Sequence, residues 1–225
     1  HTSTHSSEDG LLAEYGGGIF GDGANLPLTT FSNATIRNNI ISFNKSSREG
    51  GGIARSFGNI ENNIIKNNEA GFDNEFGSNG GGLVNCSGII SGNLITENTA
   101  SFGAGLYQCN TTIENNRIIR NTAQRGGGGL AHCGGTFQNN VIAFNISEGS
   151  WAGAGLYSCG GDLVHNTIYG NQAQESKGGG LSDCSVDIRN CIIWGNEAES
   201  GDDQITGNVN SIEYSAIEDG LTRHY

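Results

Sequence analysis

Residues 103–126 read GAGLYQCNTTIENNRIIRNTAQRG, and this stretch decides the fold. It opens on a glycine-rich tetrapeptide, continues through a short run that ends at Ile113, and then carries two asparagines five residues apart, Asn116 and Asn121. Glycine is costly inside regular structure because it loses more backbone freedom on folding than any other residue. A glycine tetrapeptide that returns along the chain therefore indicates a backbone geometry or a close contact that no side chain allows.

The unit is repeated. GGG or GAG followed by Ile or Leu begins at residues 16, 50, 80, 103, 127, 153 and 178, so the successive steps are 34, 30, 23, 24, 26 and 25 residues. Columns of matching residues follow each tetrapeptide. The first column is Asn39, Asn63, Asn93, Asn116, Asn140, Asn166 and Cys191, and the second is Asn44, Asn68, Asn98, Asn121, Asn145, Asn171 and Asn196. An Ile lies between the columns in every repeat, and a small Ser or Ala follows the second column by two residues.

This period predicts an all-β fold, a single right-handed parallel β-helix of about seven to eight coils. Helical repeats are excluded because no apolar pattern of period 3.6 occurs and because Gly and Asn are poor helix formers. About 24 residues suit three short strands joined by tight bends, and stacked coils lie about 4.8 Å apart. Asn tolerates the left-handed conformation of a bend, and its amide bonds to the amides above and below. We therefore expect glycine corners and asparagine ladders.

The motifs also resemble those of a known family. GG(A/G)(I/L), followed by units from Ile41-x-x-Asn44 to Ile193-x-x-Asn196, is similar to the repeat of right-handed parallel β-helix proteins, and especially to the passenger repeats of polymorphic outer-membrane proteins, which use Phe-x-x-Asn. The resemblance covers roughly residues 16–198. It implies the fold but leaves the function open, since such repeats occur in adhesins, polysaccharide lyases and other secreted proteins.

One domain is expected. We assign residues 1–15 to a tail or cap, 16–198 to the β-helix with insertions at 20–34 and 71–79, and 199–225 to a terminal coil or cap. The chain has no Met, which is consistent with a processed form from which a secretion signal has been removed, and we expect an extracellular or cell-surface location. The net charge of −12 argues against nucleic acid and anionic membrane surfaces as partners, and no apolar run is long enough for membrane insertion.

Cysteine and histidine are the candidate metal ligands of this chain. Five of the cysteines recur one coil apart, three residues after the Leu of the tetrapeptide: Cys86, Cys109, Cys133, Cys159 and Cys184. A straight stack does not converge on an ion as zinc ligands do, so we interpret these residues as small core residues, with disulfides between coils left open. His132 and His165 have no acidic residue at a recurring spacing. We predict no metal, no cofactor and no catalytic residue.

Binding residues are expected on an outer face. If the Ile between the Asn columns points inward, its neighbours point outward, and these neighbours are unusually apolar. Tyr169 and Trp194 stand one coil apart in one outward column, with Ile192 in the other. Aromatic rings in such a stack suit sugar faces or a partner chain. Tyr107 and Tyr157 repeat at a different corner, separated by Ala131, and form a weaker candidate pair.

Two classes of function follow. The first, which we favour, is a secreted or cell-surface β-helix that acts as a non-catalytic structural or adhesive module. Such a module would bind surface glycans or proteins, or copies of itself end to end or side by side. The alternative is a polysaccharide lyase or another carbohydrate-active enzyme. Its candidate groups are the basic residues Arg117, Arg120 and Arg125 with the acids Glu97 and Glu114.

Overall fold

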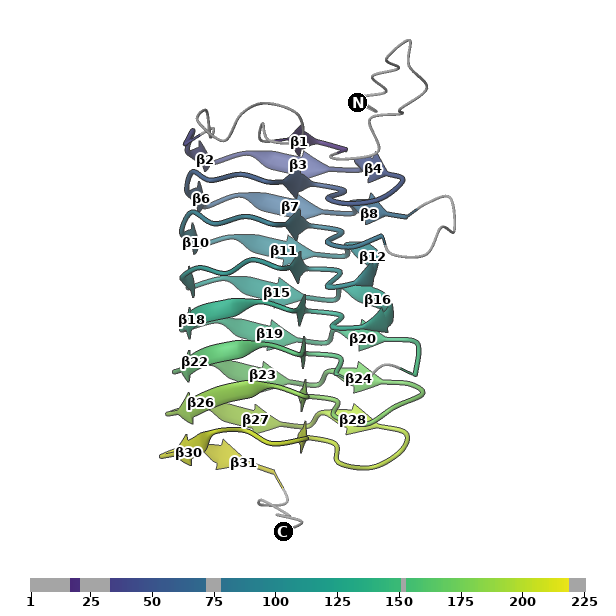
Figure 1. Cartoon of the computed structure of the whole chain (residues 1–225), viewed down its shortest axis with the longest axis vertical. Coiled ribbons are helices and arrows are strands. Elements are labelled where there is room, and N and C mark those ends of the chain that lie inside the picture. Colours follow the sequence, from purple (N-terminus) through teal and green to yellow (C-terminus); the bar gives the residue numbers. More distant parts are fainter. Residues whose placement is uncertain (1–16, 21–32, 72–77, 151–152, 219–225) are drawn as a thin grey trace.

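The computed structural model describes residues 17–20, 33–71, 78–150 and 153–218. Within these ranges the chain forms 31 short strands and no helix, and so no helix of the length and hydropathy of a membrane span. Every strand pairs in parallel with the equivalent strand of the next coil (Figure 1). The predicted all-β parallel solenoid is confirmed.

Four sheets run along the solenoid, and we number them in the order in which the chain meets them within a coil. Sheet I follows the tetrapeptides and consists of β1 (Ile19–Phe20), β5 (Ile53–Ala54), β9 (Leu83–Val84), β13 (Leu106–Tyr107), β17 (Leu130–Ala131), β21 (Leu156–Tyr157), β25 (Leu181–Ser182) and β29 (Ile205–Thr206). Sheet II precedes the first Asn column and consists of β2 (Ile36–Arg37), β6 (Ile60–Glu61), β10 (Ile90–Ser91), β14 (Ile113–Glu114), β18 (Gly134–Gln138), β22 (Gly160–Val164), β26 (Ser185–Arg189) and β30 (Ser211–Glu213).

The other two sheets lie on either side of the second Asn column. Sheet III consists of β3 (Ile40–Ser42), β7 (Ile64–Lys66), β11 (Leu94–Thr96), β15 (Arg117–Ile119), β19 (Val141–Ala143), β23 (Thr167–Tyr169), β27 (Ile192–Trp194) and β31 (Ala216–Ile217). Sheet IV consists of β4 (Lys45–Ser46), β8 (Glu69–Ala70), β12 (Thr99–Phe102), β16 (Thr122–Gly126), β20 (Ile146–Ser147), β24 (Gln172–Ala173) and β28 (Glu197–Ala198).

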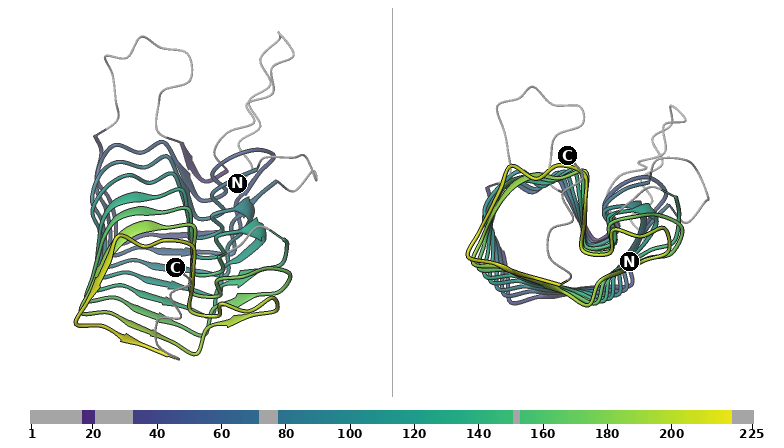
Figure 2. Two further views of the ribbon diagram at one scale, coloured as in Figure 1. Left: turned by 60° about the horizontal axis from the view of Figure 1, so that its bottom comes forward. Right: turned by 90° about the horizontal axis from the view of Figure 1, so that it is seen from below.

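The expectation of three strands per coil was wrong, because sheet IV adds a fourth. Its strands carry Ser or Ala at the inward position where the other sheets carry Ile or Leu, so they lack the aliphatic pattern that marks a buried strand. The cause is visible in the end-on view of Figure 2, where an inward turn of the chain divides a wide lobe from a narrow one. In the narrow lobe the second glycine of the tetrapeptide packs directly on sheet IV: a Cβ at Gly128 would lie 2.4 Å from the carbonyl oxygen of Ile146.

The two lobes have different cores. The wide lobe buries aliphatic residues from sheets I, II and III together with the cysteine stack, and its central Ile and Leu side chains have no solvent exposure. Each fully buried side chain of this kind stabilises the fold by about 1.5–3 kcal/mol. The hydrophobic cluster of the narrow lobe consists of alanines, Ala70, Ala100, Ala104 and Ala123, and Ser46 and Ser147 of sheet IV are also buried. Burial in the wide lobe therefore supplies most of the hydrophobic stabilisation.

The asparagine columns form the predicted ladders. Asn121 donates from its backbone N and from Nδ2 to Oδ1 of Asn145, each at 3.0 Å, and its Nδ2 also donates to the carbonyl of Ile95 at 3.0 Å. Its own Oδ1 accepts from the backbone N of Asn98 at 3.0 Å and from Nδ2 of Asn98 at 2.9 Å. The Asn121 amide is thus fully engaged by the coils before and after it, as a buried polar group must be.

The left-handed backbone lies one residue earlier than we expected. The residue before each ladder asparagine, such as Asn115 (φ 57°) or Arg120 (φ 55°), has the positive φ, and the ladder asparagine does not. The first tetrapeptide glycine is likewise left-handed: at Gly103 φ is +57°, and a Cβ would lie 2.3 Å from the carbonyl oxygen of Leu106. Glycine corners are therefore required by both torsion and space.

Several expected boundaries fall on residues that the structure does not describe. The tail at 1–15 lies outside the described residues, as do most of the insertion at 20–34 and positions 72–77 of the insertion at 71–79. Residues 199–218 continue three of the four sheets through β29, β30 and β31, whereas sheet IV ends at β28.

The C-terminal end of the second ladder is closed by side chains. Nδ2 of Asn196 donates to Oε1 of Gln204 at 2.7 Å, and Nε2 of Gln204 donates back to the carbonyl of Asn196 at 3.1 Å. Oδ1 of Asp203 accepts the backbone N–H of Ala198 at 2.9 Å, next to the end of sheet IV. These two side chains satisfy groups that a further coil would otherwise satisfy.

Candidate binding surface

The outer face of sheet III carries the predicted aromatic residues. The inward positions of its strands are buried, from Ile41 at 6% exposure to Ile193 at 0%, which confirms the predicted inward and outward alternation. Outward of them, Tyr169 is 43% exposed, Trp194 is 46% exposed and Ile192 is 50% exposed. Tyr169 and Trp194 are direct register partners in β23 and β27. The structure thus brings these three predicted residues together on one surface.

A third aromatic residue, which the sequence analysis missed, joins them. Phe144 is 47% exposed, and its ring meets that of Tyr169 edge to face, with the centroids 5.5 Å apart and an interplanar angle of 89°. We call Phe144, Tyr169 and Trp194 the aromatic platform. Phe144 occupies the left-handed bend position after β19 (φ 56°). Our prediction considered only the residues that flank the inward Ile. Phe144 is one residue further on, in the column of bend residues, and an aromatic residue in that column was the available sequence signal.

Glycines hold two of the platform rings in place. A Cβ at Gly170 would lie 2.8 Å from Cε1 of Phe144, and a Cβ at Gly195 would lie 2.9 Å from Cε2 of Tyr169. Each ring therefore lies against the bare backbone of the next coil, at a bend position where other coils carry side chains. This contact restricts the rotation of the two rings in the unbound protein, which lowers the entropic cost of binding a ligand.

The apolar surface is not continuous along sheet III. Thr96, Ile119 and Ala143 occupy the same outward column as Tyr169 and Trp194, yet they are only 8%, 8% and 3% exposed. Exposed apolar side chains gather instead at the two ends of the sheet. Those at the N-terminal end are Ile40 and Phe43, and those toward the C-terminal end are Val141, Phe144, Tyr169, Ile192 and Trp194.

The second predicted pair, Tyr107 and Tyr157, lies at the boundary between the lobes. Both rings contact His132, each with a centroid distance of 5.4 Å, and the ring of Phe102 stacks on Tyr157 at 6.1 Å. Although Ala131 separates the two tyrosines within sheet I, the His132 ring bridges them. Burial raises the pKa of both phenols; the charge of Glu49 adds to the effect at Tyr107 and that of Asp183 at Tyr157. These tyrosines belong to a packed cluster and are less accessible than the aromatic platform.

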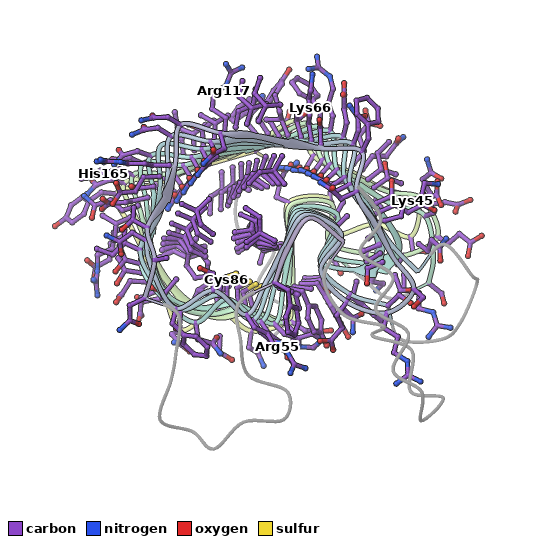
Figure 3. All side chains as sticks on the ribbon, turned by 90° about the horizontal axis from the view of Figure 1, so that it is seen from above. Lys45, Arg55, Lys66, Cys86, Arg117 and His165 are labelled. Carbon is purple, nitrogen blue, oxygen red and sulfur yellow. The ribbon has the colours of Figure 1, made fainter. Side chains whose placement is uncertain are left out.

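The groups considered for lyase chemistry are spread over three sheets, although Glu97 and Arg120 hold neighbouring bend positions after sheet III. Arg117 and Arg120 lie on sheet III and at its following bend, whereas Arg125 is in β16 of sheet IV and Glu114 is in β14 of sheet II. Within the described ranges, no group of three or more His, Cys, Asp and Glu side chains is placed to hold a metal ion. The six cysteines are buried free thiols, and Figure 3 shows Cys86 inside the wide lobe. Burial holds the pKa of Cys133 and of Cys184 well above the usual value.

Comparison of the chain with protein-family models, with curated proteins and with solved structures gave no match in any of the three. The geometry of the surface therefore carries the functional argument.

Proposed function

We propose that the protein is a secreted or cell-surface β-solenoid that binds glycans, without catalysis, through the aromatic platform on sheet III. One observation carries the proposal: three aromatic rings, each about half exposed and two of them packed against glycines, lie on consecutive coils of one face. Aromatic side chains with a large apolar surface and a polar edge are the usual contacts for such ligands. A contiguous exposed apolar patch on a folded chain commonly marks a binding site.

The solenoid supports this role because it is a rigid scaffold. Platform residues come from β19, β23, β27 and their bends, and each of these strands is paired on both sides. Sites built on regular, well-packed elements hold their geometry better than sites on loops. The likeness of the repeat motif to passenger repeats of polymorphic outer-membrane proteins agrees with an adhesive role outside the cell, and an affiliation with that family is part of this proposal.

A glycan-array screen followed by titration calorimetry tests the proposal. We expect the parent chain to bind at least one class of oligosaccharide, and Trp194→Ala to weaken that binding about tenfold through the loss of ring stacking. Tyr214→Ala is the matched control, because Tyr214 is 87% exposed but lies at a bend outside the platform. An equal loss in both variants, or no binding by the parent chain, would contradict the proposal.

A further inference from the structure

We infer that the aromatic platform selects acidic saccharides, because the face that carries it holds unpaired cations. This inference rests on the proposed function and adds the charge class of the ligand. Lys66, Arg117 and Arg120 all project from sheet III or its following bend, and Figure 3 shows Lys66 and Arg117 directed outward. In the part of the chain that the structure describes, none of the three has an ion-pair partner.

Several basic side chains on other faces form ion pairs. Lys45 pairs with Glu69 at 2.7 Å, Arg55 with Glu49 at 3.6 Å, and Lys177 with Asp202 at 3.6 Å. A further guanidinium, on sheet II, lies between two carboxylates: Arg189 is 3.6 Å from Asp162 and 3.6 Å from Glu213. In a chain with a net charge of −12, acidic residues thus pair with several cations on other faces, whereas among the described residues no ion pair joins the three cations of sheet III.

The two arginines adjoin the platform in a fixed order. The Arg120 guanidinium lies 5.8 Å from the centroid of the Phe144 ring, which in turn contacts Tyr169 at 5.5 Å. Trp194 follows Tyr169 by one coil. Arg117 is the register partner of Val141, beside the start of the platform. At about 4.8 Å per coil, the row from Arg120 to Trp194 spans about 14 Å, which suits a short oligosaccharide with an anionic group at the arginine end.

Two acidic residues lie near this row, one at each end. Glu97 occupies the bend column one coil before Arg120, on the side away from the rings, and no ion pair joins them. Glu218, at the other end, accepts hydrogen bonds from the backbone N of Gly195 and from Nε2 of Gln204. Since screening limits electrostatic reach to about 8–10 Å at physiological salt, a bound anion senses the local arginines more than the distant acidic faces. Planar guanidinium groups favour carboxylates through paired hydrogen bonds.

The probe is a short oligosaccharide of uronate units, compared with the same oligosaccharide carrying methyl-esterified carboxylates. Calorimetry with the full chain is expected to show the acid binding about tenfold more tightly than the ester, with the difference shrinking as salt rises. The double variant R117Q/R120Q should lose this preference yet keep its affinity for the ester. Arg37→Gln, which removes an exposed cation from sheet II, should change neither affinity.

The outcomes separate the two proposals. Equal binding of acid and ester by the parent chain, or a preference that survives in R117Q/R120Q, would overturn the inference and leave glycan binding by the platform standing. Binding of neither form, together with an empty glycan array, would overturn both. A loss of preference in Arg37→Gln as large as that in R117Q/R120Q would show that net charge, not the platform cations, sets the selectivity.

Discussion

The four tetrapeptide positions carry mainly glycine in the middle coils and mainly polar residues in the last described coil. In a middle coil the tetrapeptide is three glycines and a Leu, as at residues 127–130, whereas in the last coil residues 202–205 are Asp, Asp, Gln and Ile. Ile205 is the register partner of Leu181, so the two tetrapeptides are equivalent. A Cβ at Gly129 would lie 2.6 Å from the carbonyl oxygen of Gly155 in the following coil. At Gln204 the described chain has no following coil, and the side chain turns back over Asn196.

Stacking, more than the corner itself, therefore requires glycine at the third position of the tetrapeptide. Asp202 even adopts the left-handed torsion of the first glycine, with φ 54°, which Asp tolerates better than most residues. In the last described coil no carbonyl of a further coil approaches, and the second and third positions carry side chains. Gln204 accepts a hydrogen bond from Asn196, the last ladder residue, and Asp203 accepts one from the backbone of Ala198 in the last strand of sheet IV. A further in-register coil would place its carbonyl against the Cβ of Gln204. The tetrapeptide sequence thus encodes both propagation and termination of the solenoid.

The largest effect is expected from adding a methyl group inside the stack. Gly129→Ala should lower the free energy of unfolding by about 3 kcal/mol, because its Cβ would collide with backbone that cannot shift without disturbing the next coil. Gly160→Ala is the control: the nearest atom to a Cβ there is 3.7 Å away, and the change should be near neutral. Urea unfolding measures both, and similar losses would contradict the stacking argument.

The ladders give the next comparison. Asn121→Ala should cost on the order of 1–3 kcal/mol, because it leaves the backbone N–H of Asn98 without its partner and removes the Nδ2 hydrogen bond to Oδ1 of Asn145. Asn44→Ala should cost less, since among the described residues Asn44 hydrogen-bonds to one ladder neighbour, Asn68, and it is 8% exposed. Equal losses of unfolding free energy at the two positions would tell against a ladder whose members support one another.

Removal of the cap should have a smaller and more local effect. Gln204→Ala is expected to cost about 1 kcal/mol, the net value of the hydrogen bonds that close the Asn196 end. Amide hydrogen exchange should accelerate at Asn196 and Ala198 but not in the middle coils, because solenoid stability is nearly a sum of neighbour terms. Gln172→Ala serves as the control on an exposed side chain of sheet IV. Uniform acceleration along the chain would contradict a capping role.

Self-association is the weakest expected effect and tests the two ends directly. We predict that the chain associates at high concentration and more so at high ionic strength, since salt screens the repulsion of a net charge of −12. The D203G/Q204G variant, which restores glycine at the cap, should associate further by end-to-end stacking of exposed strand edges. Sedimentation at low and high salt measures both chains. Strictly monomeric behaviour throughout would exclude association, and identical association of the two chains would favour side-by-side contacts.

Sequence alone determined the repeat and much of its consequence. The positions of the tetrapeptides, the two Asn columns and the inward Ile between them follow from period and residue type, because stacked coils place equal positions in equal environments. The outward direction of Tyr169, Trp194 and Ile192 followed from strict alternation along a strand. Each of these is a local or strictly periodic property, and such a property can be inferred from a single sequence.

Only the tertiary structure decided the features that depend on how a coil bends back on itself. Sheet IV was invisible in the sequence because its inward Ser and Ala face glycine backbone across a narrow lobe, where larger side chains do not fit. Phe144 joined the platform because the ring lies over a glycine of the next coil, and His132 bridged two tyrosines that an alanine separates in sequence. Gln204 acts as a cap because its side chain folds back onto Asn196, and among the described residues no carbonyl of a further coil lies against it. These contacts join positions that are out of phase with the repeat, so they are set by three-dimensional packing and not by period.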